Sequence, residues 1–278
     1  MRNQSQPVDV SSYSMIPNPF SGPDWQTVAR PGISAATLAA NHVRRVKAAE
    51  AEQLCGASMG GIWIPYRQID DAPIREDNSD FGRLRLAVDE NGRKYHSRAG
   101  SRSHLFVSSA LGGLVAQPGC STIVLTEGEF KAMSLCEHGV AAAGVAGITN
   151  ATPQNKLLGE LQTLLEDWPV EHVVFAGDAD VGINADFSRA MVKLSAALPH
   201  DVDLSVIVPG LESPAKGIDD VRGKLGAEFG AYWDKLIDEA VPVPRGTPWE
   251  SLALALLKRE SPAAIAAIVN ASAQEEAA

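Results

Sequence analysis

Two short apolar runs that each lead into acidic residues constrain the fold of this chain more than any other feature. The first run, residues 123–126, ends in Glu127, and the second, residues 173–176, is followed by Asp178 and Asp180. Apolar runs of this length with many β-branched residues are typical of strands buried on both faces of a parallel sheet. Ligands of open α/β sheets bind beyond the carboxyl ends of the strands. We therefore expect the three acids to lie together at that edge.

The pattern around these runs alternates between strands and helices. We expect strands at residues 123–126, 140–145, 173–176 and 202–208, and helices over residues 130–137, 154–167, 185–198 and 227–239. Strands separated by helices imply right-handed crossovers and parallel pairing. Residues 119–240 are therefore predicted to form an α/β domain with a mostly parallel four-stranded sheet flanked by helices.

The segment before this domain, residues 31–118, is predicted to be a small β-rich α+β subdomain. Ser34 is a candidate cap for a helix over Ala35–Glu52. Strands follow at residues 62–66, 83–88 and 93–96, and Asn91-Gly92 is typical of a hairpin turn between the last two.

Both ends of the chain differ in composition from its middle. Residues 1–30 are rich in Ser, Pro, Asn and Gly and are expected to be an irregular tail. Residues 241–278 begin with a Pro-rich linker and continue as two short Ala/Leu-rich helices. Those helices either pack on the body of the protein or dock a partner, and the sequence leaves both alternatives open.

Basic residues are concentrated in one segment of an otherwise acidic protein. The formal net charge is -10, which excludes general affinity for polyanions, so any contact with nucleic acid needs a local basic patch. Residues 81–104 supply one, with a net charge of +4. The basic residues there are Arg83, Arg85, Arg93, Lys94, Arg98 and Arg102. With aromatic residues between them they suit a track for single-stranded nucleic acid, and the alternative is a solvated strand face that protects a sheet edge.

Several classes of site are excluded by missing motifs. Cys55, Cys120 and Cys136 are scattered, and no His-x-x-x-His pair exists, which argues against a disulfide framework and a zinc site. A reducing, cytoplasmic location suits this cysteine usage. No apolar run is long enough to cross a bilayer, so we expect no membrane association. Phosphate-binding Walker loops and the dinucleotide fingerprint are also missing.

The acids at the strand ends form the candidate site. Carboxylates that converge at one edge repel one another, so a positive charge is expected between them. Hard oxygen ligands favour Mg²⁺ or Mn²⁺, often together with substrate phosphates, which points to phosphoryl-transfer chemistry. Gly128 leaves room for a phosphate to approach the backbone, and the segment 216–220 is expected near the same edge. The alternative is that the acids only cap the helices that follow them.

At the level of motifs, Thr126-Glu127-Gly128 together with Asp178-Ala179-Asp180 resembles the TOPRIM domain. This domain is shared by bacterial-type primases, topoisomerases, recombination-mediator proteins and some nucleases, and the resemblance covers about residues 121–236. Residues 127–132 and 216–220 are more similar still to the primase-like proteins of plasmids, phages and integrated mobile elements. For the fold, the resemblance implies a TOPRIM-like Rossmannoid domain.

The same resemblance implies a function and a role for each residue. Glu127, Asp178 and Asp180 would be the catalytic, metal-binding acids, with Asp219 or Asp220 completing a second metal site. The alternative role for Glu127 is that of a general acid or base. Gly128, Lys131 and Lys216 would contact phosphate, and the basic strands would hold template or nucleotide. The implied activity is Mg²⁺- or Mn²⁺-dependent nucleotidyl transfer, in which nucleoside triphosphates are joined into primers on single-stranded DNA during replication of a mobile element. A replicative helicase is the expected partner. A metal-dependent nuclease and a non-catalytic nucleic-acid-binding module remain open as alternatives.

Overall fold

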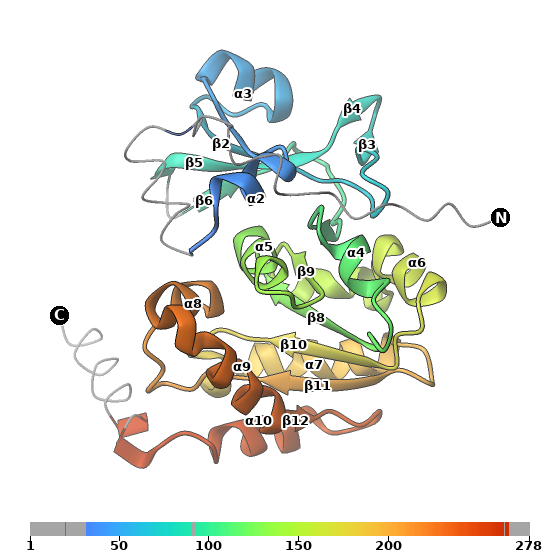
Figure 1. The fold of residues 1–278 in the computed structure, drawn as a ribbon, viewed down its shortest axis with the longest axis vertical. Coiled ribbons are helices and arrows are strands. Elements are labelled where there is room, and N and C mark those ends of the chain that lie inside the picture. The colour runs from blue at the N-terminus through green and yellow to red at the C-terminus, as the bar shows by residue number, and fades with distance from the viewer. Residues whose placement is uncertain (1–19, 21–31, 91–92, 264, 267–278) are drawn as a thin grey trace.

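The computed structural model describes residues 20, 32–90, 93–263 and 265–266, which form a smaller and a larger part (Figure 1). The predicted tail of residues 1–30 lies outside the described residues except for Phe20, which is buried. The predicted hairpin turn Asn91-Gly92 and most of the last predicted helix also lie outside them.

The smaller part is built on a four-stranded sheet with the order β1-β2-β5-β6, in which every pair is antiparallel. Its elements are α2 (Ala35–Ala40), β1 (Arg44–Val46), α3 (Ala48–Cys55), β2 (Gly61–Pro65), β3 (Arg75–Glu76), β4 (Ser79–Asp80), β5 (Gly82–Glu90) and β6 (Arg93–His96). Three of these strands lie where the sequence predicted them. Glu90 pairs with Arg93 across the expected hairpin.

The prediction of one continuous helix over Ala35–Glu52 was wrong. The Ser34 side chain accepts a hydrogen bond from the Thr37 amide, as expected of a cap, but α2 ends at Ala40. His42 has a φ of 54°, a left-handed conformation that no helix interior contains. The next residues form β1 and pair with β2. Strand pairing outside this segment therefore overrides its local helix propensity.

The larger part contains the predicted α/β alternation. Its elements are β7 (Phe106–Val107), α4 (Leu111–Val115), β8 (Thr122–Glu127), α5 (Glu129–Glu137), β9 (Ala142–Val145), η2 (Ile148–Ala151), η3 (Pro153–Asn155), α6 (Gly159–Asp167), β10 (His172–Ala176), η4 (Val181–Ile183), α7 (Ala185–Ala197), β11 (Asp203–Ile207), α8 (Ile218–Leu225), η5 (Gly226–Glu228), α9 (Phe229–Asp238), β12 (Val241–Pro242) and α10 (Trp249–Leu257).

The sheet of this part has six strands instead of the predicted four, in the order β12-β11-β10-β8-β9-β7. Its four central strands are parallel, and the two edge strands β7 and β12 are antiparallel. The edge strands contain two residues each. A strand so short has no recognisable periodicity, which is why the sequence did not reveal either of them.

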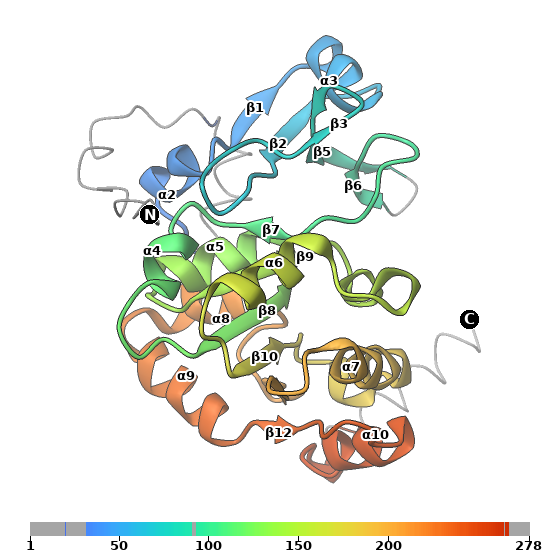
Figure 2. The same cartoon turned by 90° about the vertical axis from the view of Figure 1, so that its right-hand side faces the viewer.

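Helices cover both faces of this sheet, with α7 on one side and α8 and α9 on the other (Figures 1 and 2). The central strands are buried on both faces, as Val173, Val174 and Phe175 of β10 illustrate. Continuous burial explains why these strands read as unbroken apolar runs. Among the described residues, no helix combines the length and apolar character needed to cross a membrane.

Two helices of the larger part differ from the prediction. Helix α8 was not predicted, and it places Asp219 and Asp220 in its first turn. Helix α6 begins at Gly159 and not at Gln154, because the chain from Pro153 to Asn155 forms a separate 3₁₀ turn.

One apolar cluster joins the two parts of the molecule. It combines Tyr66 of the smaller part with Phe106, Phe130 and Met133 of the larger part. Tyr66 lies edge-on to Phe106, with ring centroids 5.4 Å apart. This packing holds the smaller part against α5, which carries Phe130 and Met133.

Candidate functional site

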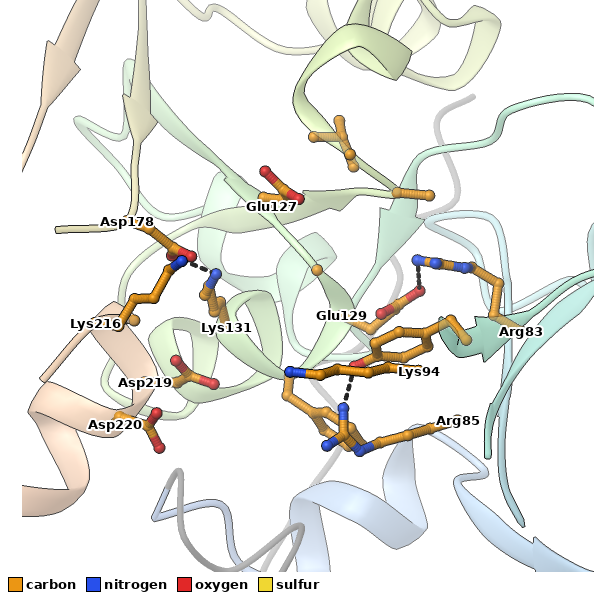
Figure 3. A pocket seen from close by; sticks show the side chains of 17 residues that line it. Arg83, Arg85, Lys94, Glu127, Glu129, Lys131, Asp178, Lys216, Asp219 and Asp220 are labelled. Atoms are coloured by element: carbon orange, nitrogen blue, oxygen red, sulfur yellow. Dashed lines mark hydrogen bonds and ion pairs between the residues drawn. The ribbon is translucent and has the colours of Figure 1, made fainter. Parts of the chain in front are cut away.

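A pocket of about 820 Å³ lies where the basic strands of the smaller part meet the carboxyl ends of β8 and β10 (Figure 3). Its charged lining residues are Arg83, Arg85, Lys94, Glu127, Glu129, Lys131, Asp178, Lys216, Asp219 and Asp220. Gly128, Tyr95 and Gly217 also line it. The structure thus brings into one cavity most of the residues that the sequence singled out from three separate strand ends and one basic segment.

The turn from β8 into α5 sets the position of the central acid. Gly128 has a φ of 103°, a region that residues with a side chain rarely adopt, and it connects Glu127 at the strand end to the first turn of α5. The Gly128 amide donates a hydrogen bond of 2.9 Å to the carbonyl of Val145 on the neighbouring strand. The turn is therefore fixed at both sides, with Glu127 facing the pocket and Lys131 one helical turn behind it.

Two lysines lie against the acids that follow β10. The ammonium of Lys131 is 2.5 Å from Oδ1 of Asp178, and these side chains are only 15% and 21% exposed. The ammonium of Lys216 is 2.7 Å from Oδ2 of Asp180, but here the exposed fractions are 65% and 47%. The first pair is enclosed by protein, whereas the second is a surface pair that solvent screens.

The close approach of Lys131 depends on Gly217, which precedes α8. A methyl group at Gly217 would lie 2.9 Å from Cε of Lys131 and 2.5 Å from Oδ1 of Asp219. Both distances are shorter than a carbon side chain tolerates. The lysine stem therefore passes directly over the Gly217 backbone and brings its ammonium between Asp178 and the start of α8 (Figure 3).

Two carboxyls in the pocket have raised pKa values. Glu127 opens onto the pocket, yet desolvation by the surrounding protein raises its pKa; the Lys131 charge lowers that pKa and the Asp178 charge raises it. Burial also raises the pKa of Asp219, against the lowering effect of Lys131. The Lys131 charge thus acts on Glu127 and Asp219 as well as on its direct partner Asp178.

Two of the predicted acids lie at the edge of this arrangement. Asp180 does not line the main pocket and borders a shallower one with Asp186 and Arg189. Asp220 lines the main pocket from the first turn of α8. The hydrogen bond between Asp180 and Lys216 connects the rim of the pocket to its lining.

The carboxylates of the site are the kind of ligand that a hard divalent ion prefers, but they are not arranged around one ion position. Carboxylate oxygens are the ligands that Mg²⁺ and Mn²⁺ prefer. Among the described residues, however, no three carboxylate, imidazole or thiolate side chains are grouped closely enough to hold one ion. Lysine ammonium groups contact Asp178 and Asp180 instead. The predicted centre of Glu127, Asp178, Asp180, Asp219 and Asp220 is therefore not a preformed metal cluster.

A buried ion pair that the sequence did not reveal forms one wall of the pocket. Oε1 of Glu129 lies 2.8 Å from the guanidinium of Arg83 and accepts a hydrogen bond of 2.7 Å from the Tyr66 hydroxyl. Glu129 is 1% exposed. Arg83, predicted to contact nucleic acid, is thus held by a protein carboxylate. No local pattern identifies Glu129, because both of its partners lie in the other part of the molecule.

The remaining basic residues divide between two pockets. Arg85 donates a hydrogen bond of 3.3 Å to the Tyr95 hydroxyl, and its guanidinium carbon is 5.3 Å from the centre of that ring. Lys94 is exposed at the rim of the main pocket. Arg93 and Arg98 line a second pocket of about 640 Å³, which also includes Tyr95.

The last member of the predicted basic set lies apart from both pockets. Arg102 is 81% exposed, and its guanidinium is 3.7 Å from Glu76. Of the six basic residues, Arg85 and Lys94 are therefore the ones that face the main pocket without an ion pair to a buried acid.

A family model described as a domain of unknown function, DUF3854, matches residues 114–229. No curated protein matches the chain.

Solved structures of primase catalytic cores share the fold. A DnaG primase catalytic domain bound to single-stranded DNA is 13% identical with a TM-score of 0.56, covering 80% of this chain and 73% of its own. The E. coli primase catalytic core is 14% identical with a TM-score of 0.54, covering 84% and 75%. The Aquifex aeolicus primase, with zinc-binding and RNA polymerase domains, is 16% identical with a TM-score of 0.53, covering 84% and 59%. The chain therefore has the fold of primase catalytic cores, the fold that the TOPRIM resemblance predicted.

Proposed function

We propose that this chain is a primase-like nucleotidyltransferase, which joins nucleoside triphosphates into a primer on single-stranded DNA. The observation that carries the proposal is the main pocket, where acids at the ends of parallel strands face cationic side chains of a second sheet. The same fold occurs in primase catalytic cores, one of them solved with single-stranded DNA. Replication of a plasmid, phage or other mobile element and partnership with a helicase remain predictions from the sequence resemblance.

The side chains of the pocket have different roles in the proposed nucleotidyl transfer. Lys131, Lys216 and Lys94 supply positive charge for the phosphates of the incoming nucleotide. Arg85 offers a cation to the backbone of a single strand. The Tyr95 ring packs against both arginines, with the guanidinium carbons of Arg83 and Arg85 lying 4.5 Å and 5.3 Å from its centre. Glu127 accepts the proton of the attacking hydroxyl, since its raised pKa makes it a better base than an ordinary carboxylate.

A divalent ion belongs to the proposal as its predicted cofactor. Bound at these carboxylates, Mg²⁺ or Mn²⁺ would neutralise charge on the leaving pyrophosphate. Glu127 is exposed at the pocket and Asp180 pairs with a largely exposed lysine, so these two predicted ligands are easier to reach than Asp178.

One observation favours a second candidate, the non-catalytic nucleic-acid-binding module. The enclosed ammonium of Lys131 already neutralises the Asp178 carboxylate. This carboxylate is therefore less able to bind a metal ion than a free one. A module of this kind would keep the basic strands and bind single strands without turnover.

A single assay separates the candidates. The full chain is incubated with single-stranded DNA, labelled ribo- or deoxyribonucleoside triphosphates, and Mg²⁺ or Mn²⁺. The proposal predicts labelled products longer than the substrates, with loss of these products in Glu127→Gln. Shortened template would indicate the nuclease, and retained template with a gel shift but no new product would indicate the binding module; either result contradicts the proposal.

A further inference from the structure

Lys131 is surrounded by acids that come from three different strand ends. Its ammonium contacts Asp178 after β10. Its stem lies beside Asp219, which follows β11 along the chain, as the close distances around Gly217 show. Its charge acts on Glu127 at the end of β8 as well. The Lys131 ammonium therefore lies where the carboxylates of this edge converge, and the more exposed Lys216 ammonium, paired with Asp180, lies at the same edge (Figure 3).

We infer that the Lys131 ammonium takes the place of one divalent cation, so that the pocket binds at most one Mg²⁺ or Mn²⁺ while the lysine is present. The inference deepens the proposed function and rests on it for its biological meaning. It concerns the number of ions that the pocket holds, which is measured without any turnover.

The low solvent exposure of the Lys131–Asp178 pair keeps the ammonium in its position. Removing one partner of an enclosed ion pair leaves an uncompensated charge, which is strongly unfavourable. Lys131 and Asp178 are mostly shielded from solvent, so a metal ion that displaced the ammonium would compensate Asp178 but leave the Lys131 charge without its partner. Lys216 and Asp180 face no such barrier, because their pair is largely exposed.

Replacing a metal by an ammonium changes the chemistry at that position. An ammonium compensates negative charge and donates hydrogen bonds to phosphate oxygens. It does not coordinate a hydroxyl and lower its pKa, as a divalent ion does. Proton removal from an attacking hydroxyl is then left to a carboxylate that opens onto the pocket, such as Glu127.

The test counts ions with Mn²⁺ as the probe. Free Mn²⁺ is measured by electron paramagnetic resonance during titration of the full wild-type chain and of Lys131→Met, which keeps the apolar stem and removes the charge. We expect at most one ion per wild-type chain. The variant should bind an additional ion or bind Mn²⁺ at least about tenfold more tightly, because a unit positive charge has been removed from among the carboxylates.

Two further variants control this comparison. Lys131→Arg keeps the positive charge and should bind Mn²⁺ like the wild type. Lys193→Met makes the same change in charge on the exposed face of α7, away from the pocket, and should also leave binding unchanged. Thermal unfolding of each variant verifies that the fold is retained, and Lys131→Gln replaces the methionine variant if that one does not fold.

Two results would overturn the inference. The first is that the wild type binds two Mn²⁺ ions and that Lys131→Met binds them with the same affinity. Such a result would mean that the metal displaces the ammonium. Unchanged or weaker binding in a folded Lys131→Met would mean that the lysine does not occupy a cation position. A chain that shows the expected ion count and yet makes no primers would instead refute the proposed function alone.

Discussion

The guanidinium of Arg83 on β5 lies 2.8 Å from Oε1 of Glu129 on α5, and this pair connects the antiparallel sheet to the α/β part. Glu129 follows the catalytic candidate Glu127 by two residues, so the pair also fixes the first turn of the helix that carries Lys131. This contact between the two parts of the molecule therefore helps to position the first turn of α5, which lines the pocket.

Arg83→Met is expected to lower the free energy of unfolding by about 3–5 kcal/mol, because it leaves the Glu129 carboxylate buried without its cation. Denaturant unfolding monitored by circular dichroism measures the change. Arg83→Met combined with Glu129→Gln should cost less than the single substitution, since no uncompensated charge remains. Arg75→Met removes an exposed pair with Asp80 and should cost no more than about 1 kcal/mol. Equal losses for Arg83→Met and Arg75→Met would contradict this assignment.

His104 makes a second bridge between the two parts, and its contribution to stability should depend on pH. Its ring nitrogens lie 3.0 Å from Glu76 and 2.5 Å from Glu160. Burial alone would lower the pKa of His104, but hydrogen bonds to Glu160 and Glu76 raise it above its usual value of about 6.5. The pKa values of both glutamates are lowered, because hydrogen bonds outweigh the raising effect of their burial.

The sign of the pH effect follows from these directions. The raised pKa of His104 gives stability that is complete below about pH 6.5 and is lost as the pH rises through the folded value. The lowered pKa values of the glutamates give stability that is present above about pH 4.5 and is lost as the pH falls. His104→Gln should therefore destabilise the protein more at pH 5.5 than at pH 8.5 in denaturant unfolding. An equal loss at both pH values would show that the bridge is not charged.

The strand-binding role of the pocket predicts a measurable salt effect. Arg85→Ala combined with Lys94→Ala should weaken binding of single-stranded DNA and reduce the slope of log affinity against log salt by about 1.4, since each phosphate contact on a single strand contributes roughly 0.7. Fluorescence anisotropy at several salt concentrations measures both quantities. Arg102→Ala, which removes an exposed cation away from both pockets, serves as the control. If the control weakens binding as much, the effect is one of overall charge and not of this pocket.

The sequence predicted those features that are encoded in continuous segments. The buried central strands appear as apolar runs, and Glu127 and Asp178 at their ends line one pocket because parallel strands share a carboxyl edge. The sequence predicted that a positive charge would lie between the acids. From the sequence, that charge was expected to be Mg²⁺ or Mn²⁺, whereas the structure places the ammonium of Lys131 against Asp178.

Features that depend on partners distant in sequence were not predictable in this way. The prediction of the first helix was wrong because Arg44–Val46 pairs with β2. The edge strands β7 and β12 were not predicted because a strand of two residues has no recognisable periodicity. Arg83 is predicted to contact nucleic acid, and a basic strand residue gives no sign of its ion pair with a buried acid 46 positions away. The two arginines look alike in the sequence. They differ only in the folded protein, where Arg83 pairs with the buried Glu129 and Arg85 bonds to the Tyr95 hydroxyl.

Glu127→Gln tests the proposed base directly. The substitution keeps the shape of the side chain, so melting temperature and DNA binding should be retained. Primer synthesis should fall by about 10²–10⁴-fold, the usual contribution of general acid–base catalysis. Because the pKa of Glu127 is raised and the base acts in its ionised form, wild-type activity should decline on the acidic side at a pH above the usual carboxyl range. A variant that is less stable but equally active would show that Glu127 only caps α5.

Gly217→Ala tests the position of the Lys131 ammonium without changing the charge of the pocket. The added methyl group would lie 2.9 Å from Cε of Lys131 and 2.5 Å from Oδ1 of Asp219, so both side chains must move. Because the ends of side chains yield more easily than backbone, we expect the fold to survive with a melting temperature close to that of the wild type. The displaced ammonium should release Asp178, and Mn²⁺ should bind more tightly than to the wild type, as in Lys131→Met.

Gly159→Ala is the matched control for this substitution. Gly159 opens α6, and a methyl group there meets no atom within 4 Å. This variant should bind Mn²⁺ like the wild type, because it adds the same group without touching the pocket. If Gly217→Ala folds and binds Mn²⁺ no more tightly than Gly159→Ala, then the carboxylates are not freed by moving the lysine. The effect of Lys131→Met would in that case come from the net charge of the pocket and not from an ammonium that occupies a cation position.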